Sequence, residues 1–228
     1  AYKYESIVPW GRSFEEYRDM FLLTPEDLDK RILGCGDGPA CFNSVMTAMG
    51  KEVASVDPLY AFTTAEIRQR IDETYVDVIS QTHDNMDKFT WSHIKDVDDL
   101  GRIRMNAMKT FLADYDRGKK EERYICAELP SLPFKDHSFD ISLSSHFLFL
   151  YTDHLTLEFH KQAIDEMLRV SHEARIFPLL EMNSYTSPYV DKIIKHYNAR
   201  GVEWDIVTVD YEFQKGGNKM LRLQKKDE

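Results

Sequence analysis

Cysteine is scarce in this 228-residue sequence, with only Cys35, Cys41 and Cys126. An odd number without zinc-ligand spacing argues against a disulfide framework and a structural zinc site, and the eight histidines form no HxxxH or Cys/His cluster. No apolar run approaches the length of a membrane span, and the first ten residues lack a signal-peptide core. We therefore expect a cytoplasmic protein in a reducing compartment, with no membrane contact and no metal.

Positive charge is also in short supply. The 29 Lys and Arg residues are outnumbered by 39 Asp and Glu, which gives a formal net charge of −10 and a pI near 5.3. Such a chain has no overall basic field to attract phosphates, so we expect no nucleic-acid partner. Hydrophobic residues make up 43% of the sequence, enough for a full core rather than a disordered chain.

Only ten glycines occur, and three of them alternate in Gly34-Cys35-Gly36-Asp37-Gly38. Apolar residues precede this stretch and a helix-compatible run, 40–48, follows it. Glycines allow positive φ and close approach of a ligand, and the first turn of a helix offers unpaired N–H groups. The pattern predicts a tight strand-to-helix turn that binds a ligand, although many such turns bind nothing.

A second strand, 52–56, ends at Asp57 and Pro58. Asp57 lies about 20 residues beyond the glycines, where nucleotide-binding folds place an acid that accepts from ribose hydroxyls. The alternative is that Asp57 only caps the following turn. Its spacing and its position at the end of a strand favour a ligand-binding role.

The remaining pattern predicts one domain over residues 1–228. Residues 1–30 form a helical cap, with a capping box at Ser13 and Glu16, which either covers the sheet edge or closes over a ligand through Arg12 or Tyr17. Strands follow at 124–129, 139–145, 174–180, 204–213 and 219–224, with helices 156–171 and 188–200 between them. Residues 215–218 supply the turn of a terminal β-hairpin. This order predicts a mostly parallel α/β sheet with helices on both faces.

The segment 63–121 is helical throughout and several times longer than an ordinary crossover. It is predicted to be an insertion after the second strand. A substrate lid, stabilising padding and an oligomer interface are equally compatible with its sequence.

Taken together, the glycine turn, Asp57 and the phrase "AELPSLPFKDHSFDISLSSHFLF" (127–149) resemble the class I S-adenosylmethionine-dependent methyltransferases, in particular their small-molecule branches. The resemblance follows the order of elements over about residues 30–225 and implies a Rossmann-like, seven-stranded sheet with an antiparallel C-terminal hairpin. It also implies S-adenosyl-L-methionine as cofactor, S-adenosyl-L-homocysteine as product and a small-molecule methyl acceptor.

The family's roles can be carried over to matching positions. Gly34, Cys35, Gly36 and Asp37 would lie against the methionine part of the cofactor, Asp57 would accept from the ribose with Pro58 beside the adenine, and Glu128, Leu129 and Ser145 would complete the site. Apart from the resemblance, Arg12 is a further candidate contact if the N-terminal segment closes over the cofactor. The sequence departs from the family at Ile32, where an acid is common. Asp29 or backbone carbonyls would then have to hold the cofactor's amino group.

For the transfer itself, His146 is the candidate general base, because histidine titrates near neutrality and follows a strand end. A histidine that only packs is an equal alternative. Tyr151 is a candidate for the acceptor pocket. Two other functions are compatible with the sequence. A non-catalytic cofactor-binding regulator is favoured by the departure at Ile32, and a nicotinamide-dependent oxidoreductase is disfavoured by the GxGxG spacing.

Overall fold

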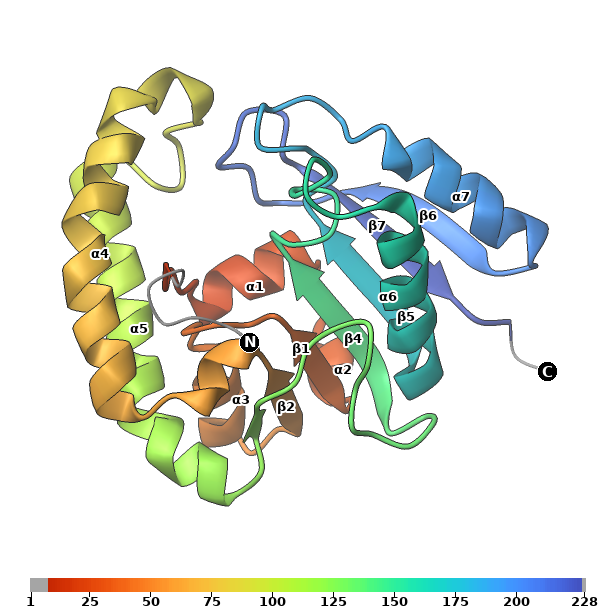
Figure 1. Cartoon of the computed structure of the whole chain (residues 1–228), viewed down its shortest axis with the longest axis horizontal. Coiled ribbons are helices and arrows are strands. Elements are labelled where there is room, and N and C mark those ends of the chain that lie inside the picture. The colour runs from red at the N-terminus through yellow and green to blue at the C-terminus, as the bar shows by residue number, and fades with distance from the viewer. Residues whose placement is uncertain (1–7, 227–228) are drawn as a thin grey trace.

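The computed structural model describes residues 8–226, so part of the expected N-terminal cap, residues 1–7, lies outside the described residues. The described chain folds as a sheet covered by helices, with a helical arm to one side (Figure 1). Its strands are β1 (Ile32–Cys35), β2 (Val53–Val56), β3 (Tyr124–Ile125), β4 (Phe139–Ser145), β5 (Ser171–Phe177), β6 (Glu203–Thr208) and β7 (Lys219–Gln224). Its α-helices are α1 (Phe14–Met20), α2 (Pro25–Leu28), α3 (Phe42–Ala48), α4 (Thr64–Asp84), α5 (Val97–Lys120), α6 (Leu157–Val170) and α7 (Tyr189–Ala199), with short 3-10 turns η2 (Pro58–Ala61) and η3 (Met86–Lys88).

The seven strands form one sheet in the order β3-β2-β1-β4-β5-β7-β6. All neighbours from β3 to β5 pair in parallel, whereas β7 runs antiparallel to both β5 and β6. The predicted mostly parallel sheet, with helices on both faces, is therefore confirmed. All four residues of β1 are buried, as expected for a central strand covered on both sides.

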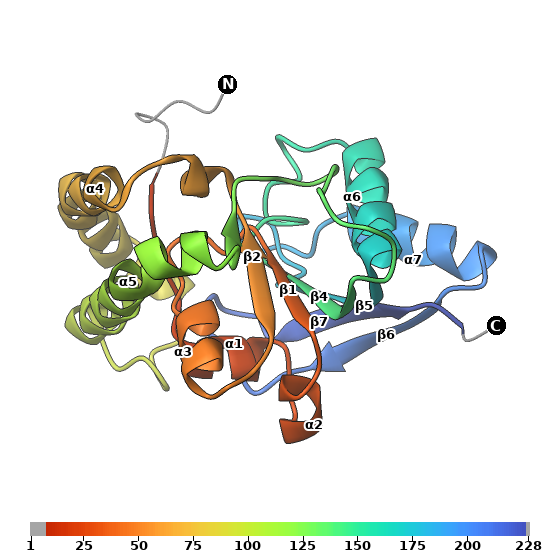
Figure 2. The same cartoon turned by 90° about the horizontal axis from the view of Figure 1, so that it is seen from below.

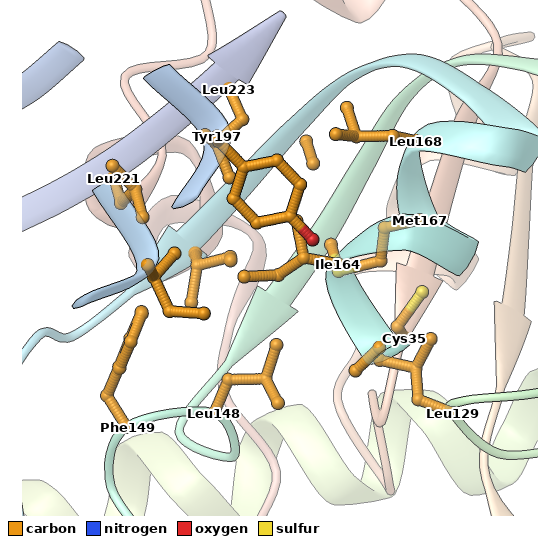
Figure 3. Close-up of a cluster of buried hydrophobic side chains, with 14 of the residues drawn as sticks. Cys35, Leu129, Leu148, Phe149, Ile164, Met167, Leu168, Tyr197, Leu221 and Leu223 are labelled. Atoms are coloured by element: carbon orange, nitrogen blue, oxygen red, sulfur yellow. The ribbon is translucent and has the colours of Figure 1, made fainter. Parts of the chain in front are cut away.

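Separate apolar cores fill the two faces of the sheet. Helices α6 and α7 cover one face (Figure 2), where Ile164, Met167 and Leu168 of α6 approach Leu221 and Leu223 of β7 (Figure 3). On the other face, side chains from α1 and α3 pack against β1, β4 and the end of β5. The predicted capping box is present at the start of α1, where the Ser13 and Glu16 side chains each accept from the other's backbone N–H.

The insertion after β2 consists of α4 and α5, which pack against each other and extend past the β3 edge of the sheet (Figures 1 and 2). A third apolar core ties this arm to the domain through side chains of η2, α4, α5 and β3. Tyr60, Phe111, Tyr115 and Tyr124 meet there with ring centroids 5.0–6.1 Å apart. The arm is thus anchored at its base by a packed aromatic cluster.

Several predicted strand boundaries were wrong. β3 stops at Ile125, because the chain turns away into a loop in which Glu128 bridges Ser131. β6 ends at Thr208, and Thr208 already pairs with Lys219. Residues 209–218 therefore form a long connection, not the short hairpin turn predicted at 215–218. Part of this connection pairs with the arm, since Phe89 forms an antiparallel bridge with Gln214.

Candidate functional site

Two adjoining cavities lie at the carboxyl ends of β1, β2 and β4. The sheet order reverses between β1 and β4, the position at which open α/β sheets bind ligands. The larger cavity has a volume of about 520 Å³ and the smaller one of about 160 Å³. Gly36, Asp57, Ser145 and His146 line both. Four residues singled out from the sequence are thus brought to one place by the ends of three strands.

The glycine turn leaves β1 with two left-handed residues, Gly36 at φ +77° and Gly38 at φ +51°. A side chain at either position would strain the backbone, so glycine is required by conformation. Gly34 has a different role, because it lines neither cavity. A Cβ added to Gly34 would lie 1.8 Å from Oδ2 of Asp37, so its missing side chain makes room for that carboxylate.

Asp37 folds back into the protein rather than pointing to solvent. One carboxylate oxygen accepts from the Tyr17 hydroxyl at 2.8 Å and the other from the Ser55 hydroxyl at 2.5 Å. Burial raises the pKa of Asp37 to about 6, although these two hydrogen bonds oppose the shift. Asp37 also lines the larger cavity. It therefore offers a buried carboxylate just after β1, whereas Ile32, at the start of β1, is the position at which the sequence lacks the expected acid.

Asp57 combines the two roles that the sequence left open. It caps η2 by accepting from the Leu59 N–H at 2.8 Å, and its other oxygen accepts from the Gly38 N–H at 2.8 Å. It also lines both cavities. Burial raises its pKa to about 6, which still leaves the carboxylate mostly ionised at neutral pH. Asp57 therefore ties the glycine turn to the end of β2 and retains lone pairs for a ligand.

The smaller cavity is a slot between the ends of β1, β2 and the loop after β3. Besides the shared residues, Cys35, Pro58, Glu128 and Leu129 line it, together with Ala127 and Phe147. All four were predicted from the sequence. The Cys35 side chain itself is buried in the core on the α6 side, and burial raises the pKa of its thiol (Figure 3).

His146 follows β4 with a left-handed backbone, at φ +54°. Its backbone N–H donates to the Phe177 carbonyl at 2.7 Å, and its ring Nδ1 lies 2.7 Å from the Ser145 hydroxyl. Burial, reinforced by the charges of Arg12 and Arg104, holds the pKa of His146 well below its usual range. The imidazole is therefore neutral at physiological pH and faces the cavity as a hydrogen-bonding group. Tyr151, also predicted, lines the larger cavity near its surface.

Two arginines border the larger cavity, and only Arg12 was singled out from the sequence. Arg104 on α5 is 1% exposed and forms an ion pair with Glu16, which also accepts from the Tyr211 hydroxyl at 2.8 Å. The sequence carried one signal for Arg104. It occupies a position of α5 between Leu100 and Met108 on the buried stripe, where an apolar residue is expected.

The tip of the arm borders the larger cavity. Phe89 stacks on Phe213 of the β6–β7 connection with centroids 4.6 Å apart, and both rings line the cavity. The Thr90 N–H donates to the Phe213 carbonyl at 2.7 Å, and the Lys215 N–H donates to the Lys88 carbonyl at 3.0 Å. These two distant segments meet beside the sheet in Figure 1. We call this contact the latch.

One expectation about the site was wrong. Asp29 precedes β1, at the edge of the sheet opposite the cavities, where it is exposed and paired with Lys51. It is too far along the strand direction to reach a ligand at the glycine turn. Over residues 8–226, no cluster of three or more His, Cys, Asp or Glu side chains is arranged to hold a metal ion. In the same residues no helix is both long and apolar enough to span a bilayer.

Comparison with known proteins places this geometry in a family. A family model described as a methyltransferase domain matches residues 103–174. An uncharacterized protein of Methanocaldococcus jannaschii is 39% identical over 217 residues, which cover 94% of this chain and 95% of that protein.

Solved structures show weaker likeness. A putative S-adenosyl-L-methionine-dependent methyltransferase of Methanococcus maripaludis is 11% identical, with a TM-score of 0.49 over 94% of this chain and 84% of that one. A SAM-dependent methyltransferase of Aquifex aeolicus is 12% identical, with a TM-score of 0.42 over 98% and 97%.

The family match and the site agree with each other. The methyltransferase model covers α5 to β5, and the glycine turn and Asp57 lie outside it, at the ends of the neighbouring strands β1 and β2. The sheet order and the antiparallel β7 are those expected from the sequence resemblance. The chain belongs to one family with the Methanocaldococcus jannaschii protein, and the match to a methyltransferase domain over residues 103–174 indicates an S-adenosylmethionine-dependent methyltransferase.

Proposed function

We propose that the protein methylates a small-molecule acceptor held in the larger cavity, by direct in-line transfer. The observation that carries this proposal is the pair of adjoining cavities, whose shared wall contains Gly36, Asp57, Ser145 and His146. S-Adenosylmethionine supplies an electrophilic methyl group on a sulfonium, so the protein must mainly align the reactants and exclude water. The closed latch and the aromatic lining suit an enclosed small acceptor better than a macromolecule.

The smaller cavity would take the adenine. Glu128 would accept from the adenine amino group, and the Leu129 backbone and Pro58 would flank the ring. Asp57, at the junction of the cavities, would accept from the ribose hydroxyls. Cys35 would contribute backbone only, because its thiol is in the core. Each of these roles uses a group that already lines the cavity in question.

The methionine end would lie over Gly36, beside Asp37. The buried carboxylate of Asp37 would receive the cofactor's ammonium group and so replace the acid absent at Ile32. Gly34 would act indirectly, by leaving the space that Asp37 fills. Ser145 would hold His146 in orientation through the 2.7 Å contact at Nδ1.

His146 would hydrogen-bond the acceptor rather than carry a charge. Its depressed pKa keeps a lone pair available at neutral pH, but also makes it a weak base. Tyr151, at the rim, would contact the acceptor's outer part. The arm formed by α4 and α5 would serve as the lid, since its tip and its inner residues complete the cavity wall.

The test is calorimetric titration of the purified protein with S-adenosylmethionine, S-adenosylhomocysteine and NADH. The first two ligands should bind, and Asp57→Asn should weaken both by about tenfold or more, since a hydrogen bond to a charged group contributes about 1.5–3 kcal/mol. Asp116→Asn, on the exposed side of α5, is the matched control. Binding of NADH alone, or of none of the three, would contradict the proposal.

A further inference from the structure

Arg12 and Arg104 place two guanidinium groups on the wall of the larger cavity. They come from different parts of the chain, Arg12 from the segment before α1 and Arg104 from the lid helix α5. Both are close enough to His146 for their charges to depress its pKa, which puts them at the same end of the cavity as the end of β4. The sequence offered Arg12 as a cofactor contact, but neither arginine is used in the cofactor contacts proposed above.

The charged groups around these arginines do not balance within residues 8–226. Glu16 is the acid that faces them, and it is shared: it pairs with Arg104, while Arg12 acts on it only through its charge. Their joint attraction holds the pKa of Glu16 at about 2, so it is fully ionised. The other polar neighbours are the hydroxyls of Tyr17 and Tyr211 and the neutral His146. Two cations and one anion leave one positive charge next to the arginines, while the carboxylates of Asp37 and Asp57 line other parts of the same cavity.

Unused donors accompany this charge. The Nε atoms of both Arg12 and Arg104 are buried and, within the described residues, have no hydrogen-bond partner. A buried donor without a partner destabilises the protein, and more so when the group is charged. The Nε edge of a guanidinium is one of the faces with which arginine binds a carboxylate through two parallel hydrogen bonds. Both arginines line the larger cavity, and their unused Nε donors are buried beside it.

We propose that Arg12 and Arg104 form an anion subsite, and that the methyl acceptor is an organic acid anchored there by one carboxylate. One carboxylate neutralises the single excess charge, whereas a doubly charged phosphate would overcompensate it. Part of the wall is apolar, with Trp10, Leu150, Met182 and the latch rings Phe89 and Phe213, and this part suits a hydrocarbon or aromatic body. A carboxylate held by guanidinium groups has its lone pairs engaged, so it anchors the acceptor and another atom receives the methyl group.

This inference rests on the proposed function, because it names the acceptor class of the same site. The cofactor also carries a carboxylate, on its methionine end, and is the competing source of the anion. The two sources differ in a measurable way. An acceptor subsite binds acids after the cofactor site is filled, whereas a cofactor contact is lost when the cofactor's own carboxylate is removed.

The experiment titrates the protein, saturated with S-adenosylhomocysteine, with benzoate, phenylacetate, benzamide and phenyl phosphate at low salt. Benzoate or phenylacetate should bind at least tenfold more tightly than benzamide, and more tightly than phenyl phosphate. Arg12→Gln should weaken carboxylate binding about tenfold, which corresponds to about 1.4 kcal/mol, and leave benzamide unchanged. Arg12→Lys should recover only part of the affinity, because lysine keeps the charge and loses the fork.

Arg68→Gln, an exposed arginine of α4, is the matched control and should change nothing. Arg104→Gln serves as a second variant only, since it leaves Glu16 buried without its partner. Equal affinity for benzoate and benzamide, or no binding of any acid, would overturn the inference. The inference would also be overturned if Arg12→Gln weakened the binding of S-adenosylhomocysteine but left the binding of decarboxylated S-adenosylmethionine unchanged. Failure of S-adenosylhomocysteine to bind the wild type would instead refute the proposed function.

Discussion

Asp37→Asn should make the protein more stable and a poorer cofactor binder at the same time. The carboxylate of Asp37 is buried, and its pKa is about 6, compared with 3.8 for an unperturbed aspartate. Because the folded pKa is the higher one, ionisation of Asp37 opposes folding at neutral pH. Its contribution to stability is complete below about pH 4 and is lost as the pH rises through 6.

The magnitude follows from the two pKa values. The difference, 6 − 3.8, is about 2 pH units, and each unit corresponds to 1.36 kcal/mol, which gives about 3 kcal/mol at pH 7.5. Asparagine avoids this cost and keeps an oxygen for the Tyr17 hydroxyl. Some of the gain is offset because the Ser55 hydroxyl loses a charged acceptor. We expect Asp37→Asn to raise the free energy of unfolding by about 1–3 kcal/mol at pH 7.5.

The assay is urea unfolding of wild type and variant, without cofactor, at pH 4.5 and pH 7.5. The stability difference should be largest at pH 7.5 and should shrink toward zero at pH 4.5. Asp114→Asn is the opposite case, because Arg123 and Tyr124 donate to that carboxylate and hold its pKa below the usual range. The Asp114 variant should be less stable than wild type at pH 7.5 and lose that deficit in acid.

Cofactor binding supplies the other half of the prediction. If Asp37 receives the ammonium group, the asparagine variant should bind S-adenosylhomocysteine at least tenfold more weakly at pH 7.5. Wild-type affinity should fall as the pH drops through 6, where Asp37 and Asp57 become protonated. A stability difference that does not change with pH, or a variant that is less stable at pH 7.5, would refute the reasoning about Asp37.

Two further predictions concern the glycine turn and the lid. Gly34→Ala should lower the free energy of unfolding in urea by about 2–4 kcal/mol, because its Cβ would displace Asp37. In an Asp37→Ala background the same substitution should lower it by under ~1 kcal/mol. Equal losses in both backgrounds would show that the clash is with another residue. Phe213→Ala should raise the rate of amide hydrogen exchange at Thr90, whose N–H donates to the Phe213 carbonyl, because the lost ring stacking contributes about 0.5–1.5 kcal/mol. Phe14→Ala, away from the latch, is the control variant. An unchanged exchange rate at Thr90 in the Phe213 variant would mean that the latch rings do not hold the arm in place.

Local patterns were sufficient for the order of the elements. The capping box at Ser13 correctly located the start of α1, and the helix predicted at 188–200 corresponds to α7. These features depend on neighbours a few residues apart, so sequence spacing reports them directly. Strand ends were placed poorly, as at Ile125 and Thr208, because the end of a strand depends on the partner with which it pairs.

The cofactor half of the site could be anticipated because strand ends and glycine turns leave marks in the sequence. Of the residues proposed to contact the acceptor, His146 and Tyr151 were named from the sequence, but the surroundings of the acceptor could not be foreseen. Arg104 lies within an ordinary helical segment, and its partner Glu16 is 88 residues away. The latch joins Phe89 to Phe213, and nothing in either local segment indicates the other.

By itself, the sequence determined the parallel sheet, the position of the insertion and the glycine turn after β1, because each follows from local spacing and backbone conformation. Only the tertiary structure decided that the Asp37 carboxylate folds back into the space beside Gly34, that Asp29 lies at the opposite edge, and that Arg12 and Arg104 share one cavity. These relations depend on burial and on contacts between distant segments, which no local pattern encodes.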